Sequence, residues 1–399
     1  MQLSKFNLQK VDDLFKETLE LLEWHTICSH LSTFAVSNKG RLKCKSLPIP
    51  HDISSSREQL QQVLELGSLD AIIEGGLSFK GIFDLENILL VCSKGGICSG
   101  EELLQVAQTL RNSRKLRTQI SDVSVRPAIS SLIESISTLP ELQQLLEFGL
   151  EEGGRVADRA SRKLSDMRGH FNVLRLERRD MLLEITRKYS TFLHDNVIYE
   201  RFGRPVLAVK VGTANQVQGI VHDTSSSGNT IFLEPHAVIK IGNKIVELKS
   251  RIINEENRLL GIWSAEVGNN YSIIEHLCEI ILQLELVLAR ARYGKWLSGL
   301  PPVLQEEETE SFSIKDFRHP LLLWQERNDS GQKVIPISFD VPSGLKVVAI
   351  TGPNTGGKTA ALKSFGLALI MARAGMLLPC SRQPSLPWCQ QIYADIGDE

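Results

Sequence analysis

The stretch VVAITGPNTGGKTAA, residues 347–361, constrains the fold of this chain more than any other. Its apolar, β-branched start predicts a strand over 346–351, and the pattern from Lys358 onward predicts a helix. The glycines of the intervening loop, 352–357, permit backbone conformations in which consecutive amides point at an anion. This order of strand, loop and helix is the context that the pattern G-x-x-x-x-G-K-T needs to act as a phosphate-binding loop.

The chemistry of the loop assigns a role to each part of it. The N-terminus of the following helix adds the positive end of its dipole to the loop amides. Lys358 is predicted to reach the β- and γ-phosphates of ATP, and Thr359 to hold Mg²⁺. The candidate ATP-binding residues are Gly352, Pro353, Asn354, Thr355, Gly356, Gly357, Lys358 and Thr359.

Composition limits the class of protein. The 399 residues are enough for several domains, and 42% apolar with 23% charged residues is typical of a globular protein. Because the net charge is −2, nucleic-acid binding has to rest on a local basic patch. The seven cysteines are scattered without a C-x-x-C motif, which predicts free thiols in a reducing compartment. With neither a signal peptide nor a membrane span in the pattern, we expect a cytoplasmic protein.

Residues 1–153 have a helical period almost throughout and predict a helical core domain. Ser99 and Glu102 have the spacing of a capping box at a helix start. No catalytic constellation stands out in this part of the sequence, and its histidines have no acids at metal-ligand spacing.

A basic helical stretch follows over 154–189, with only a narrow apolar stripe. Two interpretations remain open: a solvated helix face with intrahelical ion pairs, or an arm that contacts phosphates. On the second interpretation, the nucleic-acid-binding candidates here and in the strand region that follows are Arg175, Arg178, Arg179, Arg204 and Lys210.

Strands are predicted over 205–211, 218–222 and 230–234, so that 154–236 forms an ascending lever arm with a small β region. His222 and Asp223 beside three serines could indicate a hydrolase. However, adjacent residues of a strand point to opposite faces, so a loop in which Ser and Asp bond to their own backbone is favoured.

From Ala237 the helical period returns and, apart from a weak point at 268–270, continues to about Trp296. If continuous, this returning lever helix, residues 237–300, would be a rod of roughly 80 Å. The Gly154 to Tyr189 stretch is its expected antiparallel partner. An acidic linker over 301–311 then leads to a nucleotide domain over 312–399, with further strands over 334–339 and 391–396.

Several motifs resemble the MutS family of DNA-repair ATPases, in its second bacterial branch, MutS-two. They are GPNTGGKTA (Gly352 to Ala360), Phe317-Arg318-His319-Pro320, GIVHDTSSSGNTIFLEP (Gly219 to Pro235), ADIGDE (Ala394 to Glu399) and GGLSFKGIFDL (Gly75 to Leu85). The similarity extends over essentially the whole chain, and Ala360 stands where the family usually has valine.

The resemblance implies a multidomain fold. Its parts are a mainly α core, long antiparallel lever helices, a small β clamp tip and the first part of an α/β P-loop ATPase domain of the ABC type. Asp398 and Glu399 lack the apolar strand that precedes Walker B acids, so the catalytic residues are not identified in this sequence. We therefore expect an N-terminal fragment that is not competent to hydrolyse ATP.

For the intact protein, the resemblance implies a homodimeric clamp ATPase that binds branched or mismatched DNA, suppresses homologous recombination and carries an endonuclease in its C-terminal part. One alternative is a sensor of collided ribosomes that binds rRNA and splits stalled ribosomes with ATP. Another is a non-catalytic binding fragment. A basic arm suits DNA and rRNA phosphates equally, so the sequence leaves these alternatives open.

Overall fold

The computed structural model describes residues 14–120, 124–306, 311–328, 331–351 and 357–396. Its contacts divide the chain into two compact units. The first comprises Met1–Glu86, Gln108–Leu139 and Ser272–Glu399, and the second comprises Asn87–Ala107 and Pro140–Tyr271. Each unit is described separately below.

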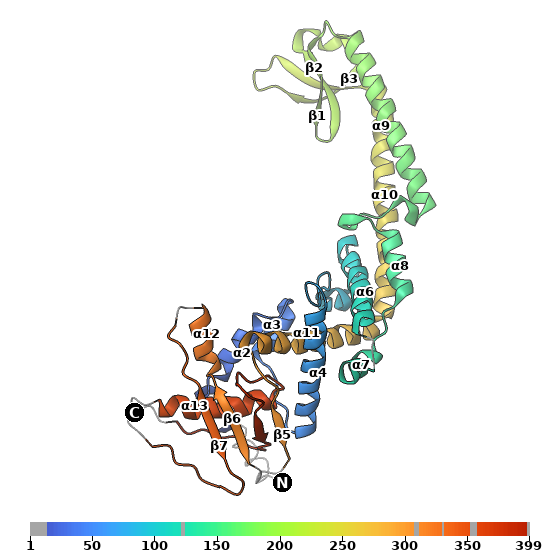
Figure 1. The fold of residues 1–399 in the computed structure, drawn as a ribbon. Coiled ribbons are helices and arrows are strands. Elements are labelled where there is room, and N and C mark those ends of the chain that lie inside the picture. Colours follow the sequence, from blue (N-terminus) through green and yellow to red (C-terminus); the bar gives the residue numbers. More distant parts are fainter. Residues whose placement is uncertain (1–13, 121–123, 307–310, 329–330, 352–356, 397–399) are drawn as a thin grey trace, which may run out of the picture. The chain divides into compact units, whose positions relative to one another are not determined.

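Helices form most of the first unit, as expected for the mainly α core (Figure 1). They are α2 (Trp24–Ser32), α3 (Asn38–Lys45), α4 (Ile53–Ile72), α7 (Pro127–Glu134), α11 (Tyr271–Leu297), α12 (Pro320–Asn328) and α13 (Lys358–Arg373), with the later part of α6 (Gly100–Ile120). Local capping starts two of them: Ser37 accepts a bond from the Gly40 amide, and Asp52 from the Ser55 amide. Such caps satisfy amides that the first helical turn leaves without partners.

A four-stranded sheet in the order β5-β8-β6-β7 completes the first unit. Its strands are β5 (Val303–Gln305), β6 (Phe312–Phe317), β7 (Ile337–Val341) and β8 (Ser385–Pro387). One apolar core joins this sheet to α2, α11 and α13. Tyr293 of α11 and Phe317 of β6 are the largest of its fully buried side chains.

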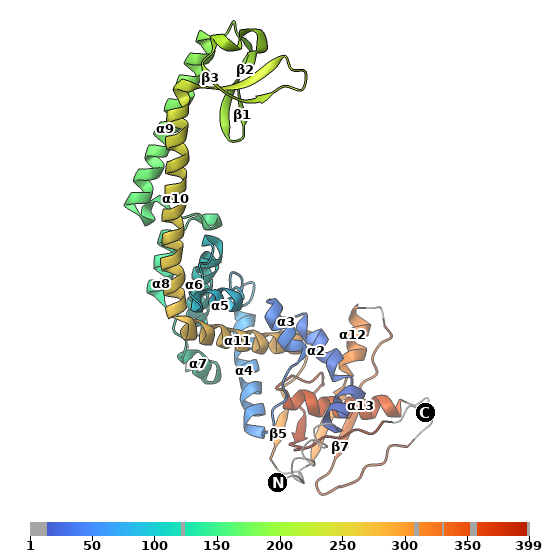
Figure 2. The ribbon, with the colours of Figure 1, turned by 180° about the vertical axis from the view of Figure 1, so that it is seen from behind.

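The second unit contains α8 (Pro140–Gly149), α9 (Arg162–Lys188), α10 (His236–Asn269), most of α5 (Glu86–Ser93) and the start of α6. The short 3₁₀ helices η1 (Glu152–Gly154), η2 (Asp158–Ala160) and η3 (Val211–Gln216) join its elements. An antiparallel sheet in the order β1-β2-β4-β3 lies at the end of α9 and α10 (Figure 2). Its strands are β1 (Leu193–Arg201), β2 (Arg204–Lys210), β3 (Gly219–Thr224) and β4 (Thr230–Pro235).

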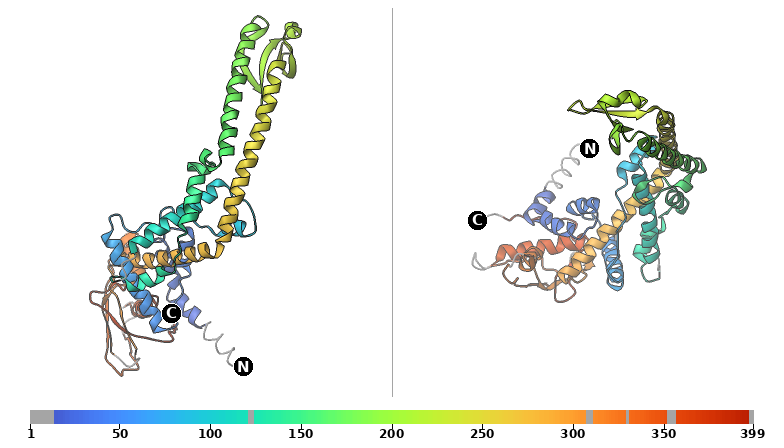
Figure 3. Two further views of the ribbon diagram at one scale, coloured as in Figure 1. Left: turned by 90° about the vertical axis from the view of Figure 1, so that its right-hand side faces the viewer. Right: turned by 90° about the horizontal axis from the view of Figure 1, so that it is seen from above.

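Helices α9 and α10 run side by side in opposite directions (Figure 3). Ion pairs of 2.9 Å and 2.6 Å join Lys163 to Glu255 and Arg168 to Glu256 across them. The 34 residues of α10 make a helix of roughly 50 Å at 1.5 Å per residue. The expectation of long antiparallel lever helices is therefore confirmed within this unit.

The prediction of one continuous helix from Ala237 to Trp296 is wrong, because α10 ends at Asn269 and α11 begins at Tyr271. The break falls at Gly268-Asn269-Asn270, where the helical pattern weakens. The Gly268 Cα leaves little space there, since an added Cβ would come within 2.6 Å of the Cys92 carbonyl oxygen. The sequence therefore locates the break correctly, but the predicted length of about 80 Å assumes that the helix continues through it.

Two expected strands are absent, and four strands, β1, β5, β6 and β8, were not expected. Residues 345–351 and 391–396 have no regular secondary structure, and none of the described strands bonds to either segment. An isolated strand cannot form the ladder of hydrogen bonds that defines a sheet. The longest of the unexpected strands is β1, whose polar start, LHDN, obscures the β-forming residues Val197 to Tyr199.

One other expectation, a capping box, is met. The capping box at α6 forms, since the Ser99 amide donates to Glu102 over 2.8 Å and the Glu102 amide donates to the Ser99 hydroxyl over 3.3 Å. Among the described helices, none is both long and apolar enough to cross a membrane. All seven cysteines lie in described residues, and no disulfide joins them.

Candidate functional site

The candidate phosphate loop is described only at its end. Gly352, Pro353, Asn354, Thr355 and Gly356 lie outside the described residues. Gly357 is the N-cap of α13 with φ 78° and ψ 21°, a left-handed conformation that residues with a Cβ adopt at a steric cost. Lys358 is then the first residue of α13 and Thr359 the second, as the sequence predicts.

The N-terminus of α13 has properties suited to an anion. Its N-cap residue, Gly357, has no side chain that could cap it, and its first turn contains no acidic residue. The amides of a first helical turn have no partner within the helix, and they face the same direction as the positive end of the dipole. Lys358 is half-buried and Thr359 is exposed at this end. These residues fit the terminal phosphates of ATP and a Mg²⁺ ion, so the ATP and Mg²⁺ assignment stays a prediction with a compatible geometry.

Behind this end, α13 is attached to the N-terminal part of the chain. Lys363 donates to Glu23 over 2.9 Å, and the bond lowers the pKa of the Glu23 carboxyl. An added Cβ on Gly366 would come within 2.8 Å of Leu22, so a larger residue would move the helix. Glu23 and Lys363 support the candidate site, but no motif in the sequence connects them.

His319 of the Arg318-His319-Pro320 motif lies in the same neighbourhood. It is 7% exposed, and burial together with the charge of Lys363 lowers its pKa to about 4, although Glu23 opposes the shift. Its Nδ1 atom has no hydrogen-bond partner among the described residues. Pro320 begins α12 directly after it, where a missing amide hydrogen is tolerated. His319 is therefore a neutral, buried residue that lies behind the loop helix.

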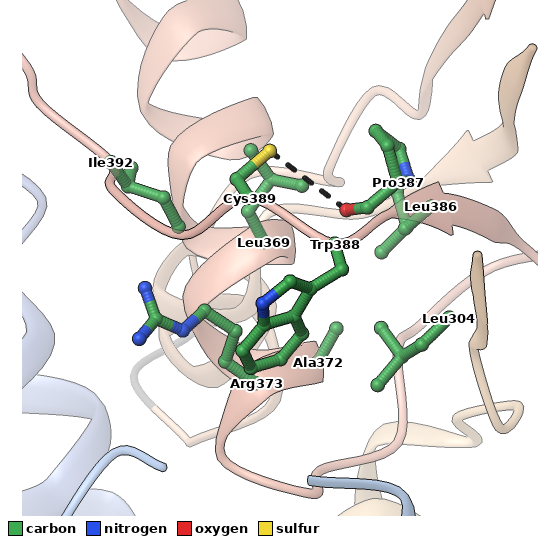
Figure 4. A pocket seen from close by; sticks show the side chains of 9 residues that line it. All are labelled: Leu304, Leu369, Ala372, Arg373, Leu386, Pro387, Trp388, Cys389 and Ile392. Carbon is green, nitrogen blue, oxygen red and sulfur yellow. Dashed lines mark hydrogen bonds between the residues drawn. The ribbon is translucent and has the colours of Figure 1, made fainter. Parts of the chain in front are cut away.

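A hollow beside the C-terminal half of α13 is a different feature (Figure 4). It is lined by Leu304, Leu369, Ala372, Arg373, Leu386, Pro387, Trp388, Cys389 and Ile392, and it leaves no space that a water molecule could enter. Ligand pockets, in contrast, enclose roughly 300–1,000 Å³. The Arg373 guanidinium lies 5.0 Å from the centre of the Trp388 ring, and burial lowers its pKa. We assign Arg373 to packing in this hollow.

Two of the nucleic-acid candidates, Arg178 and Arg204, lie in the same region of the second unit. Arg204 lies 3.6 Å from the buried carboxylate of Glu234, which also accepts a bond from His222 over 2.8 Å. Burial and the charges of Arg175 and Arg204 lower the pKa of Arg178, while Glu234 and Glu200 oppose that shift. Arg178 and Arg204 therefore lie in a charge cluster that joins α9 to the sheet.

The other three candidates lie at the surface. Arg175 is exposed with its guanidinium 5.8 Å from the centre of the Phe171 ring, and Arg179 is 3.5 Å from Asp180. Lys210 donates to the Thr191 carbonyl over 3.2 Å from the exposed end of β2. An exposed ion pair such as Arg179–Asp180 contributes little to stability, so a partner could replace it at little cost. All three charges are accessible to a partner. Phosphate binding by them stays a prediction.

His222 and Asp223 do not form a catalytic pair. Asp223 accepts from Arg201 over 3.1 Å, whereas His222 bonds to Glu234. The serine loop is held by its own backbone, because the Thr230 amide donates to Ser225 Oγ over 3.1 Å and the Ser225 amide donates to the Thr230 carbonyl over 2.8 Å. The expectation of a self-bonded loop is confirmed. Glu234, the buried centre of the cluster, was not identified from sequence, because nothing separates it there from an exposed strand residue.

A glycine-capped helix beginning Lys-Thr and a small sheet carried on two antiparallel helices are both elements that the MutS resemblance implies. No family model matches the chain. Comparison with individual proteins nevertheless shows that it is homologous to the endonuclease MutS2 family, which confirms that resemblance.

Three relatives illustrate the extent of the similarity. Endonuclease MutS2 of Synechocystis sp. is 40% identical over 385 residues, which cover 96% of this chain and 47% of the relative. Endonuclease MutS2 of Pelotomaculum thermopropionicum is 34% identical over 391 residues, or 96% of this chain and 48% of that protein. Endonuclease MutS2 of Clostridium perfringens is 31% identical over 385 residues, with the same two coverages. The chain thus spans about half the length of these curated relatives.

Proposed function

We propose that this chain supplies the helical core, the lever helices and the start of the ATPase domain of a MutS-type clamp. In this proposal the clamp binds branched or mismatched DNA, responds to ATP and suppresses homologous recombination. The observation that supports it best is the arm of α9 and α10, which carries the β1–β4 sheet and exposes Arg175 and Arg179 along α9. A long arm with accessible arginines can follow a phosphate backbone, where affinity depends on neutralised phosphates.

Nucleotide is the proposed control of this clamp. Residues 352–359 would hold ATP, with Lys358 at the β- and γ-phosphates and Thr359 at Mg²⁺. The uncapped N-terminus of α13 and the left-handed Gly357 support this assignment. Two such sites in a homodimer would open and close the clamp, and the cytoplasmic location stays part of the proposal.

The endonuclease activity in the names of the relatives has a separate place in this proposal. We assign it to the part of those proteins that this chain does not match, together with the acids that complete ATP hydrolysis. On this assignment the 399 residues contribute the binding of nucleotide and nucleic acid.

Binding of a fluorescent ATP analogue tests the nucleotide assignment. Lys358→Ala should weaken analogue binding in Mg²⁺ at least tenfold, because the terminal phosphate loses its cationic partner. Lys333→Ala, an exposed lysine outside the loop, is the matched control and should leave binding unchanged. Equal affinity in Lys358→Ala and the parent chain would refute the loop assignment.

The choice between DNA and the ribosome needs a second experiment. Gel shifts on four-way DNA junctions, against co-sedimentation with ribosomes on sucrose gradients, compare the two partners at one salt concentration. The proposal expects tighter binding to the junction. Co-sedimentation with ribosomes without any junction shift would instead support the ribosome-splitting alternative.

A further inference from the structure

The turn between β1 and β2 has an unusual residue at its tip. Arg201 pairs with Arg204 across the hairpin, so Phe202 and Gly203 form a two-residue loop. Their φ values are 52° and 74°, the positive signs that a type I′ turn requires at both positions. Asn, Asp and Gly are preferred at its first position, since a residue with a bulky side chain is strained in the left-handed region. Phe202 therefore occupies a position that its own backbone does not favour.

Packing does not explain the phenylalanine either. Its side chain is 83% exposed, the highest value among the large apolar residues of the described chain. The core of the sheet is formed instead by Leu193, Leu207, Val209, Val217 and Leu233. The positive φ of Phe202 is the kind of backbone outlier from which a function can be inferred, because neither conformation nor packing requires a phenylalanine here.

The neighbourhood of this tip is rich in arginine. The two residues that flank the turn, Arg201 and Arg204, are held in place: Arg201 lies 4.2 Å from the centre of the Phe232 ring and bonds to Asp223, and Arg204 faces Glu234. Strand β1, at whose end the turn lies, contacts α9, the helix that carries the exposed Arg175 and Arg179. These two arginines stay accessible to phosphates.

We propose that Phe202 is a stacking wedge for an unpaired base at a branch or mismatch in a bound nucleic acid. The inference rests on the proposed clamp function and adds the residue that would distinguish branched from fully paired substrates. An aromatic ring gains stacking energy from any unstacked base, and wedges of this kind are inserted where a helix is already opened. The exposed Arg175 and Arg179 of α9 favour a nucleic acid over an apolar protein surface, since the phosphates that accompany each base are attracted to them.

The test uses the 399-residue chain and a four-way DNA junction with one unpaired 2-aminopurine at its centre. The parent chain should quench the fluorescence of this base. Phe202→Asn removes the ring while suiting the left-handed turn, so it should abolish the quench and weaken junction binding roughly tenfold, the size expected for one stacked base. Phe202→Trp keeps an aromatic ring and should retain both signals. Fully paired duplex should bind equally to all three proteins.

Two further measurements separate a binding role from a structural one. The melting temperature of Phe202→Asn should equal or exceed that of the parent, because the strained residue is replaced by one that accepts the turn. Ile72→Asn alters another exposed apolar residue, 77% exposed in the first unit, and should change neither quench nor affinity. An RNA junction of the same sequence shows whether the stacked base belongs to DNA or RNA.

Four results would overturn the wedge. If Phe202→Asn quenches and binds like the parent, the wedge fails while the clamp proposal stands. If the parent binds no nucleic acid, both fail together. If the parent binds but the base keeps its full fluorescence, only the wedge fails. If the parent forms concentration-dependent dimers that Phe202→Asn abolishes, the tip contacts a second copy of the chain instead.

Discussion

Two segments of similar sequence have opposite outcomes in this structure. Strand β2 contains PVLAVK over 205–210, and the segment before the phosphate loop contains KVVAIT over 346–351. In β2, Val206, Leu207 and Val209 are each 0% exposed between β1 and β4. Val347 is 80% exposed, and none of the described strands pairs with its segment. The difference teaches that β-branched residues favour a strand only where neighbouring strands accept their hydrogen bonds.

Hydrogen exchange should show the largest difference between the two segments. Amides of β2 open only when the sheet of the second unit opens, whereas those of 346–351 are unprotected by any described strand. We expect exchange at least 1,000-fold slower in β2, measured by mass spectrometry on peptides from each segment. Equal protection of 346–351 would mean that the segment has found a partner strand in solution.

Truncation of apolar side chains should sharpen the same comparison. Leu207→Ala removes a fully buried side chain and is expected to cost about 2–5 kcal/mol of unfolding free energy. Val347→Ala changes an exposed side chain and should stay within about 0.5 kcal/mol. Denaturant unfolding measures both changes in unfolding free energy. Hydrogen exchange of the β1–β4 sheet then shows whether the stability lost in Leu207→Ala belongs to the second unit. Equal costs would contradict the assigned burial.

The two units also differ in how they hold ionisable groups, and His319 gives the larger pH effect. Its pKa is lowered from 6.5 to about 4, so between these values the folded chain binds fewer protons than the unfolded one. Stability should therefore fall as pH falls from 6.5 to 4, by about 3 kcal/mol in total. His319→Asn should flatten this part of the stability profile, measured by denaturant unfolding at each pH. A parent profile that is already flat there would contradict the burial of a neutral histidine.

Glu255 should give a smaller effect at lower pH in the second unit. Bonds from Arg258, Lys163 and Ser161 lower its pKa from 4.5 to about 2, although burial opposes the shift. The stabilisation is present above pH 4.5 and should be lost as pH falls toward 2. We expect roughly 1–2 kcal/mol, since Lys163 and Arg258 are largely exposed and solvent screens them. In Glu255→Gln the unfolding free energy should no longer depend on pH in this way. If this variant keeps the pH dependence, a group other than Glu255 causes it.

The sequence predicts well what depends on local pattern. The capping box at Ser99, the long helix from His236 and the glycine-capped start of α13 all follow from spacing and residue type. The polar start of β1 obscured that strand, and the rod was drawn too long because one weak turn at Asn270 ends α10. Local sequence patterns do not show the distant residues that contact these segments, and those contacts decide whether a strand forms or a helix ends.

The candidate sites divide in the same way. Motif spacing identified Lys358 and Thr359, and composition identified the arginines of α9. Glu234, Glu23 and Phe202 required the fold, because their importance lies in burial, a long-range bond and a positive φ. The structure also separates Arg178 and Arg204, which lie in a charge cluster with Glu234, from the accessible Arg175 and Arg179.

The central claim is that the α9 arm contacts nucleic-acid phosphates, and the salt dependence of junction binding tests it most directly. Each lost phosphate contact should reduce the slope of log K against log salt by about 0.9 on duplex DNA. Arg175→Gln with Arg179→Gln should therefore weaken binding and flatten the slope by one to two units. Lys333→Gln with Arg382→Gln, exposed basic residues outside the arm, should leave it unchanged. An unaltered slope in the first variant would contradict the claim and show α9 to be a solvated helix.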